Sequence, residues 1–224
     1  MAPATPYARF VQRWGEPALE LGCGHGEPLL DLVAAGLDVT GLDSSADMVE
    51  LCRTEARRQG LRVQLVCQSM QAMDLKRRFR SIYLAGPTFQ LVVDLADVAT
   101  ALHRIADHLT PDGRTLIPLF TPQPIDPGTV GVWREHVTAE GETLAVRTMA
   151  QSYRREERRV DSTLEYRPGP SEKPIELVER TWSLRWYDDA EFATLASNAG
   201  LVVKRTIDHG QFGRSLILSL ASVA

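Results

Sequence analysis

The feature that most constrains the fold is a glycine-rich turn between two short apolar runs. The runs cover residues 17–21 and 37–42, and the turn between them carries Gly22, Gly24 and Gly26. Residues 27–35 repeat leucine and valine at helical spacing, and Gly36 can cap the end of that helix. A buried strand, a helix and a second buried strand in this order predict a βαβ unit with two parallel strands.

The same alternation continues along the chain to residue 120. Helices are expected over 45–59 and 95–109, and strands over 61–67, 80–84 and 115–120. A turn at Thr110 to Gly113 separates the second of these helices from the last strand. Strands that alternate with helices of this length predict a mostly parallel, doubly wound, Rossmann-like α/β sheet with helices on both faces.

The pattern changes at a proline-rich segment, residues 121–128. Beyond it, polar and apolar residues alternate over 143–153, 159–166 and 175–186, as they do in half-buried antiparallel strands. We therefore expect an inserted three-stranded antiparallel sheet, within residues 129–182, that forms a substrate wall or a dimer surface. Residues 1–128 and 183–224 would make the main domain, which a helix over 188–199 and strands over 201–207 and 215–222 would complete.

The glycine turn lies where an open α/β sheet binds its ligands, and it precedes an acidic residue at the end of the second strand. Glycine allows backbone to approach a ligand closely, and Asp43 can accept hydrogen bonds from both hydroxyls of a ribose. The spacing is not the G-x-G-x-x-G of dinucleotide-binding proteins, and Glu27 at the helix start would repel a pyrophosphate. The acids Glu20 and Glu27 suit the cationic methionine end of S-adenosylmethionine better.

At these residues the chain resembles the class I S-adenosylmethionine-dependent methyltransferases. Their first motif reads like Glu20 to Gly26, and their second like Gly41 to Ser45 with Met48 following. The insertion and the closing glycine-rich hairpin are most similar to the small-molecule branch, including sugar-amine N-methyltransferases. The resemblance implies a seven-stranded sheet with an antiparallel last strand, S-adenosyl-L-methionine as cofactor, and a lid formed by residues 7–12.

The resemblance also assigns the cofactor-binding residues. They are expected to be Glu20, Gly22, Cys23, Gly24, Asp43, Ser44, Met48, Ser69, Met70, Leu84 and Ala85. Many relatives have Asp where this chain has Ser69, which can still hydrogen-bond the adenine amine but lacks the charge. Candidate substrate residues are Tyr7, Phe89, Arg185 and Tyr187, and the candidates for a catalytic base are His209 and His136.

Composition excludes several classes of function. The net charge is −4 and the basic residues are scattered, which argues against nucleic acid as a substrate. Three cysteines without CxxC spacing argue against a metal site and favour a reducing compartment. The first ten residues contain no continuous apolar stretch, so we expect neither a signal peptide nor membrane association, and a cytoplasmic location. The inserted sheet could support a homodimer.

The sequence favours an enzyme that transfers a methyl group from S-adenosylmethionine to a nitrogen or oxygen of a small molecule by in-line displacement. It leaves three alternatives open. These are a module that binds S-adenosylmethionine without turnover, a NAD-dependent oxidoreductase, and a methyltransferase that acts on a protein.

Overall fold

The computed structural model describes residues 5–137, 143–168 and 177–221. The described chain forms two compact units. The first comprises residues up to Phe120 together with those from Tyr187 onward, and the second comprises Thr121–Trp186.

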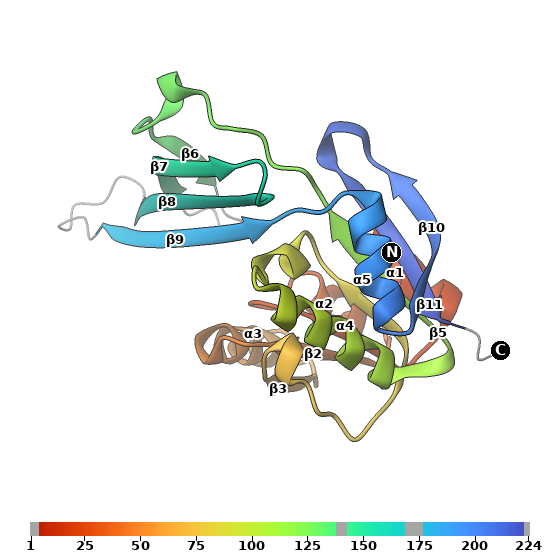
Figure 1. The fold of residues 1–224 in the computed structure, drawn as a ribbon. Coiled ribbons are helices and arrows are strands. Elements are labelled where there is room, and N and C mark those ends of the chain that lie inside the picture. The colour runs from red at the N-terminus through yellow and green to blue at the C-terminus, as the bar shows by residue number, and fades with distance from the viewer. Residues whose placement is uncertain (1–4, 138–142, 169–176, 222–224) are drawn as a thin grey trace. The chain divides into compact units, whose positions relative to one another are not determined.

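The first unit is built on a seven-stranded sheet in the order β10-β11-β5-β4-β1-β2-β3 (Figure 1). Its strands are β1 (Ala18–Leu21), β2 (Val39–Asp43), β3 (Gln64–Cys67), β4 (Phe79–Leu84), β5 (Leu109–Leu119), β10 (Leu201–Asp208) and β11 (Arg214–Leu220). The first five pair in parallel, and β11 is antiparallel to both of its neighbours. This topology confirms the predicted Rossmann-like sheet with an antiparallel last strand.

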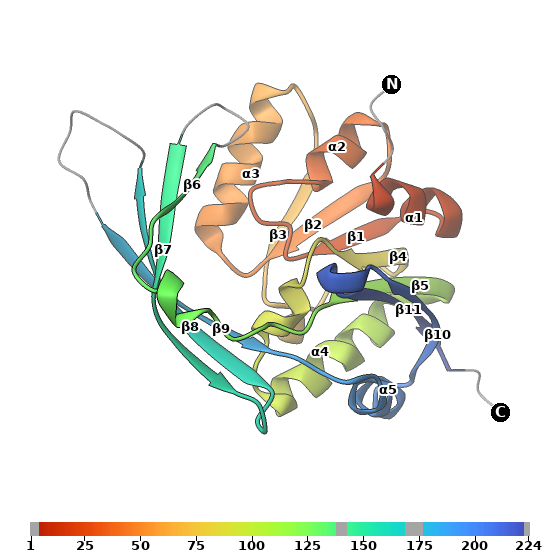
Figure 2. The same ribbon diagram turned by 90° about the horizontal axis from the view of Figure 1, so that it is seen from above.

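Helices cover both faces of this sheet, as Figure 2 shows with the sheet seen almost edge-on. One face carries α1 (Pro6–Trp14), α2 (Leu29–Ala34) and α3 (Ala46–Arg58), and the other carries α4 (Leu95–His108) and α5 (Asp189–Asn198). Side-chain caps start four of these helices, because the oxygens of Thr5, Ser45, Asp94 and Asp188 accept from backbone N–H groups of the first turn. Two apolar clusters result, one on each face of the sheet.

The expected turn at Thr110 to Gly113 was wrong, because these residues lie within β5. Phe79 of β4 pairs with Leu109, while Ser81 pairs with Arg114, so the four turn residues form an irregularity in the ladder. A Cβ on Gly113 would lie 3.0 Å from the carbonyl oxygen of Phe79. The residues that resemble a turn therefore bulge out of the strand without ending it.

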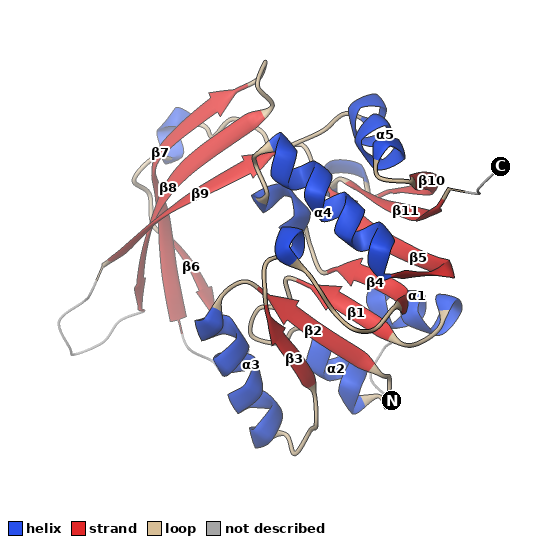
Figure 3. Ribbon diagram, turned by 60° about the horizontal axis from the view of Figure 1, so that its bottom comes forward, coloured by secondary structure: helices blue, strands red, loops and turns tan. Residues whose placement is uncertain are grey.

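The second unit is a four-stranded antiparallel sheet in the order β6-β7-β8-β9 (Figure 3). Its strands are β6 (Arg134–Val137), β7 (Thr143–Arg154), β8 (Arg159–Pro168) and β9 (Val178–Arg185). The prediction of three strands was wrong, because β6 is only four residues long and shows too little alternation to be recognised. The proline-rich segment also belongs to this unit, since Ile125 N–H donates to Gln151 Oε1 at 2.8 Å.

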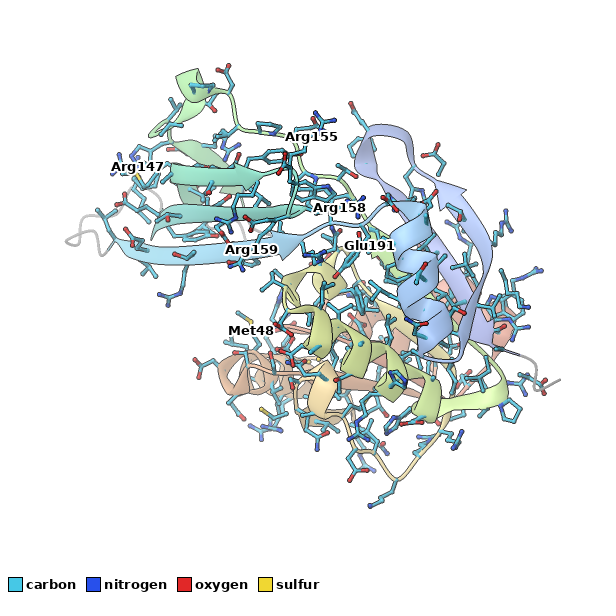
Figure 4. The ribbon with its side chains drawn as sticks, viewed as in Figure 1. Met48, Arg147, Arg155, Arg158, Arg159 and Glu191 are labelled. Carbon is cyan, nitrogen blue, oxygen red and sulfur yellow. The ribbon has the colours of Figure 1, made fainter. Side chains whose placement is uncertain are left out.

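Arginines are frequent on this second unit, and Figure 4 labels four of them. At the β7–β8 hairpin, Arg154 forms ion pairs with Glu157 and Asp161, and Arg159 pairs with Asp161 at 3.0 Å. On the sheet, Arg147 pairs with Glu165 at 2.6 Å. The mixed run of arginine and glutamate at residues 154–159 thus forms local ion pairs.

Candidate functional site

The glycine turn combines tight packing at one end with open space at the other. The N–H groups of Gly22 and Cys23 both donate to the Leu42 carbonyl, at 2.7 and 3.0 Å. Gly22 has φ +71°, and a Cβ there would lie 2.3 Å from Thr88 Cγ2. Gly24 has φ +53°, but a Cβ there would meet nothing within 4 Å. The backbone at Gly24 is therefore accessible to a ligand.

Asp43 at the end of β2 holds this turn in place. Its Oδ2 accepts from the Gly24 N–H at 2.8 Å, and its Oδ1 accepts from the Ser45 N–H at 2.9 Å. An ionised carboxylate has about four acceptor positions, so both oxygens keep a lone pair for a further donor. The carboxylate can thus organise the turn and bind a pair of hydroxyl groups.

A first pocket of about 330 Å³ opens beside these residues. Five of the predicted cofactor residues line it, namely Gly22, Asp43, Ser44, Ser69 and Met70. Sequence reasoning missed other lining residues, including Gln68, Gln71, Thr88, Asp94 and Asp97. Asp94 could have been found, because a helix-capping acid shortly after β4 lies at the ligand-binding edge of the sheet. The lining carries three aspartates, and no lysine or arginine belongs to it among the residues described.

Glu20 lies in β1 directly before the turn and is fully buried. Its Oε2 accepts a hydrogen bond from Tyr83 Oη at 2.7 Å, while Oε1 is buried without a partner. Burial raises the pKa of Glu20 to about 8, although the hydrogen bond from Tyr83 opposes this change. A buried carboxylate with one unpartnered oxygen is suited to a cationic ligand group.

The other predicted cofactor residues are distributed around the turn. Cys23 is buried, and both its hydrogen bond with Cys52 and its burial raise the pKa of its thiol, which does not suit a nucleophile. Met48 is exposed on α3 (Figure 4). Leu84 ends β4 as a buried residue, and Ala85 follows it half-buried.

A second, larger pocket of about 820 Å³ lies between α1 and strands β5, β10 and β11. Its lining is apolar at many positions but includes six cationic side chains, those of Arg9, Arg13, Arg114, Lys204, Arg205 and Arg214. No carboxylate is found among the described residues of this lining. Gly86 and Pro87 line this pocket, and the next residue, Thr88, lines the first pocket, so one segment after β4 contributes to both linings.

Two of the predicted acceptor-side residues line the second pocket. Tyr7 on α1 accepts a hydrogen bond from the Gly86 N–H at 3.0 Å and stacks on Tyr83 with ring centroids 5.5 Å apart. His209 lines the pocket from the β10–β11 hairpin, with Nε2 at 2.9 Å from Ser215 Oγ. The side chain of the other candidate base, His136, lies outside the described part of the structure, although its backbone pairs in β6.

Three substrate candidates are not brought to either pocket. Phe89 and Tyr187 are buried in the core, where both pack against Phe192 with centroids 5.7 and 5.6 Å away. Aromatic residues near the sheet edge were expected to line a substrate site, but the same spacing also suits a core cluster. Arg185 belongs to the second unit and donates to the Glu157 carbonyl at 3.0 Å.

These residues fit a cofactor that has a ribose and a cationic end. The two carboxylate oxygens of Asp43 can accept from ribose hydroxyls, and the backbone at Gly24 has open space beside it. Glu20 has a buried oxygen without a hydrogen-bond partner, which suits the cationic end. A pyrophosphate is a poor match for the first pocket, because Asp43, Asp94 and Asp97 line it.

Comparison with known proteins agrees with this chemistry. A methyltransferase domain family matches residues 18–113, which contain the glycine turn and Asp43. The chain is 27% identical over 221 residues to dTDP-3-amino-3,6-dideoxy-alpha-D-glucopyranose N,N-dimethyltransferase of Streptomyces fradiae, covering 97% of this chain and 83% of that protein. The chain is a class I S-adenosylmethionine-dependent methyltransferase.

Solved structures share the fold of this methyltransferase. The CcbJ methyltransferase from Streptomyces caelestis superposes with a TM-score of 0.76 at 19% identity, covering 96% of this chain and 88% of that one. The sugar N-methyltransferase KedS8 from Streptoalloteichus sp ATCC 53650 gives a TM-score of 0.73 at 20% identity, with coverages of 99% and 89%.

No helix within the described ranges is long and apolar enough to cross a membrane. The described histidine, cysteine and acidic side chains form no group of three that could hold a metal ion.

Proposed function

We propose that this methyltransferase methylates an amine nitrogen of a small-molecule acceptor that also carries an anionic group. The observation that carries the proposal is the pairing of an acidic pocket with a basic pocket at the segment 86–88. A cationic cofactor end suits the first pocket and an anionic acceptor suits the second. Their boundary is then the place where the methyl group passes from one to the other.

The cofactor residues follow from the first pocket. Asp43 would hold the ribose, Ser44 and Met48 would border the adenine, and Ser69 and Met70 would contact its edge. Glu20, Gly22, Cys23 and Gly24 would surround the methionine end, with the backbone of Leu84 and Ala85 accepting from its ammonium. S-adenosylmethionine supplies an activated methyl group on a sulfonium.

The acceptor class draws support from the relative in Streptomyces fradiae, which is named for a dTDP-linked 3-amino sugar. Such a molecule has both an amine and a diphosphate, and six cationic side chains line the second pocket. Displacement at a methyl carbon mainly requires the nucleophile to be held in line and close. The cations would fix the anionic end and so orient the amine toward the boundary segment.

Turnover tests this proposal. Purified protein is incubated with S-adenosylmethionine and dTDP-3-amino-3,6-dideoxyglucose, and S-adenosylhomocysteine and the methylated sugar are measured by mass spectrometry. We expect N-methylation, and a much lower kcat/KM for the same amino sugar without its nucleotide. Equal kcat/KM for the two acceptors, or no turnover by protein that binds the cofactor, would contradict the proposed acceptor class.

Two further predictions from sequence stay predictions, namely a cytoplasmic location and a homodimer formed through the second unit. The same is true of a role for that unit as a substrate wall.

A further inference from the structure

We propose that His209 accepts the proton that the acceptor's ammonium must lose before methyl transfer, and that Ser215 positions its imidazole. This inference rests on the proposed function, because it requires an amine acceptor in the second pocket. It assigns a catalytic residue to a reaction that can in principle proceed by proximity alone.

The β10–β11 hairpin holds His209 at the ligand-binding edge of the sheet. The His209 N–H donates to the Gly213 carbonyl at 2.8 Å, which closes the hairpin. Gly213 has φ +96°, and a Cβ there would lie 2.3 Å from the Leu119 carbonyl oxygen. Only glycine allows the hairpin to pack this closely on the end of β5, so the imidazole lines the same pocket as Tyr7 and Gly86.

The lining of the pocket leaves few groups that could take a proton. Its six cations, from α1, β5, β10 and β11, have none to accept, and the described lining includes no carboxylate. Asp208 lies next to His209 but outside the lining, and its Oδ1 accepts from the Gly210 N–H at 2.8 Å. The hydroxyl of Tyr7 accepts from Gly86. Imidazole is the side chain that gains and loses a proton near neutral pH.

The same cations create the need for such a group. A primary amine in water is an ammonium at neutral pH and has no lone pair for nucleophilic attack. Nearby positive charges disfavour that charged form, so the amine gives up its proton more readily within the pocket than in water. The proton must nevertheless be transferred to a defined acceptor, because the nitrogen attacks only after losing it.

Ser215 determines which ring nitrogen is free. It is buried in β11, and its Oγ lies 2.9 Å from His209 Nε2. We assign the hydrogen to Nε2, which donates to Ser215 Oγ and leaves the lone pair on Nδ1. The acceptor ammonium then passes one proton to Nδ1. The freed nitrogen pair forms the new bond to the methyl carbon as the carbon–sulfur bond breaks, and the sulfur keeps that bonding pair.

A pair of variants with a matched control tests this role. The variants are His209→Gln and Ser215→Ala, and the control is His103→Gln, which removes an exposed imidazole from α4. With dTDP-3-amino-3,6-dideoxyglucose as acceptor, we expect His209→Gln to lower kcat about 100-fold and to shift the rise of kcat/KM to higher pH, because the acceptor ammonium must then lose its proton to water. Ser215→Ala should lower kcat about tenfold and keep the wild-type pH profile, and the control should match the wild type.

Cofactor binding by calorimetry separates failure of this inference from failure of the proposed function. All the variants should bind S-adenosylhomocysteine with the affinity of the wild type. Unchanged kcat and pH profile in His209→Gln would overturn the assignment of the base. If the wild type binds the cofactor but does not methylate the amino sugar, the proposed acceptor fails and the role of His209 fails with it.

A second measurement needs no acceptor. Nitrogen chemical shifts of 15N-labelled histidine distinguish the two neutral tautomers, and the His209 signals are those missing from His209→Gln. We expect His209 to carry its hydrogen on Nε2 in the wild type and to become a mixture of tautomers in Ser215→Ala. A hydrogen on Nδ1 in the wild type would overturn the proposal.

Discussion

The two pockets of the first unit differ in size, in charge and in how they are encoded. The first is small, is lined by three aspartates, and is built from the segments that follow β1, β2, β3 and β4, between Gly22 and Asp97. The second is more than twice as large, is lined by six cations, and is built from residues between Pro6 and Ile217. The first pocket therefore forms within the N-terminal half of the chain, whereas the second exists only once the two ends of the chain have come together.

Under the proposed function, each pocket has a separate task. The cofactor would be held by the segments that follow the first four strands. The acceptor would be held by the helix and hairpin that surround the sheet, which can change while the fold is kept. The pockets should therefore respond independently to substitution, and a variant in one should leave binding in the other intact.

The largest effect is expected from Asp43→Ala. The substitution removes hydrogen bonds from Gly24 and Ser45 as well as the proposed ribose acceptors, and charge-assisted hydrogen bonds each contribute about 1.5–3 kcal/mol. We expect affinity for S-adenosylhomocysteine to fall at least about 100-fold by calorimetry. Asp43→Asn keeps an acceptor oxygen, so its affinity for S-adenosylhomocysteine should fall only about tenfold. If Asp43→Ala bound the cofactor normally, the assignment of the first pocket would be wrong.

Glu20→Gln should remove a pH dependence. The pKa of Glu20 is raised from 4.5 to about 8, so the cofactor-free protein holds this carboxyl protonated at neutral pH. A cofactor ammonium favours the ionised form, so binding should release a proton, and affinity should rise by up to about tenfold per pH unit until about pH 8. Calorimetry in buffers of different ionisation enthalpy measures the released proton.

The same group sets a trend in stability with the opposite sign. Because the folded protein binds this proton more tightly than the unfolded chain, the contribution of Glu20 is most favourable below about pH 4.5 and is lost as pH rises to about 8. Thermal unfolding of the cofactor-free protein should show this decline, and Glu20→Gln should flatten it. An equal slope in both proteins would contradict the role of Glu20.

Arg214→Lys should affect the second pocket alone. The guanidinium of Arg214 is held by the Tyr187 carbonyl at 2.9 Å and by Asp189, whose Oδ1 lies 2.7 Å from Nε. Lysine keeps the charge but not the planar donor geometry. We expect the acceptor KM to rise about tenfold while cofactor affinity stays the same. The control is Arg53→Lys on α3, because Arg53 lines neither pocket. It should leave the acceptor KM and the cofactor affinity unchanged.

Salt should produce the smallest effect and should also distinguish the pockets. Several cations of the second pocket are exposed, so salt screens their charges. Raising the ionic strength from about 0.1 to 0.5 M should therefore raise the KM of an anionic acceptor a few-fold. The affinity for the cofactor should change less, because half-buried Asp43 and buried Glu20 would hold its ribose and its cationic end. Steady-state kinetics at saturating cofactor measures the first response and calorimetry the second. A larger change in cofactor affinity would reverse the comparison.

Sequence reasoning predicted the fold well where local signals agreed with the packing. The glycine turn, Asp43 and the strand–helix alternation are local features, and the seven-stranded sheet follows from them. A turn was wrongly predicted at Thr110 to Gly113 because a bulge within a strand uses the same residue types as a turn. Strand β6 was missed because four residues are too few to show the alternation of polar and apolar side chains.

The second pocket could not be predicted from the sequence. Its cations are scattered among Arg9, Arg114 and Arg205, and no short motif connects them. The scattered basic residues were taken to argue against nucleic acid as a substrate, which stays a prediction. Folding nevertheless collects six of them around one cavity, because α1 and the final hairpin lie beside β5.

The most direct test of the central claim is calorimetric titration of the purified protein with S-adenosylmethionine, S-adenosylhomocysteine and NAD. The geometry of the first pocket predicts that both sulfur nucleotides bind at a single site and that NAD does not, because three aspartates would face its pyrophosphate. Binding of NAD without binding of the sulfur nucleotides would contradict the account.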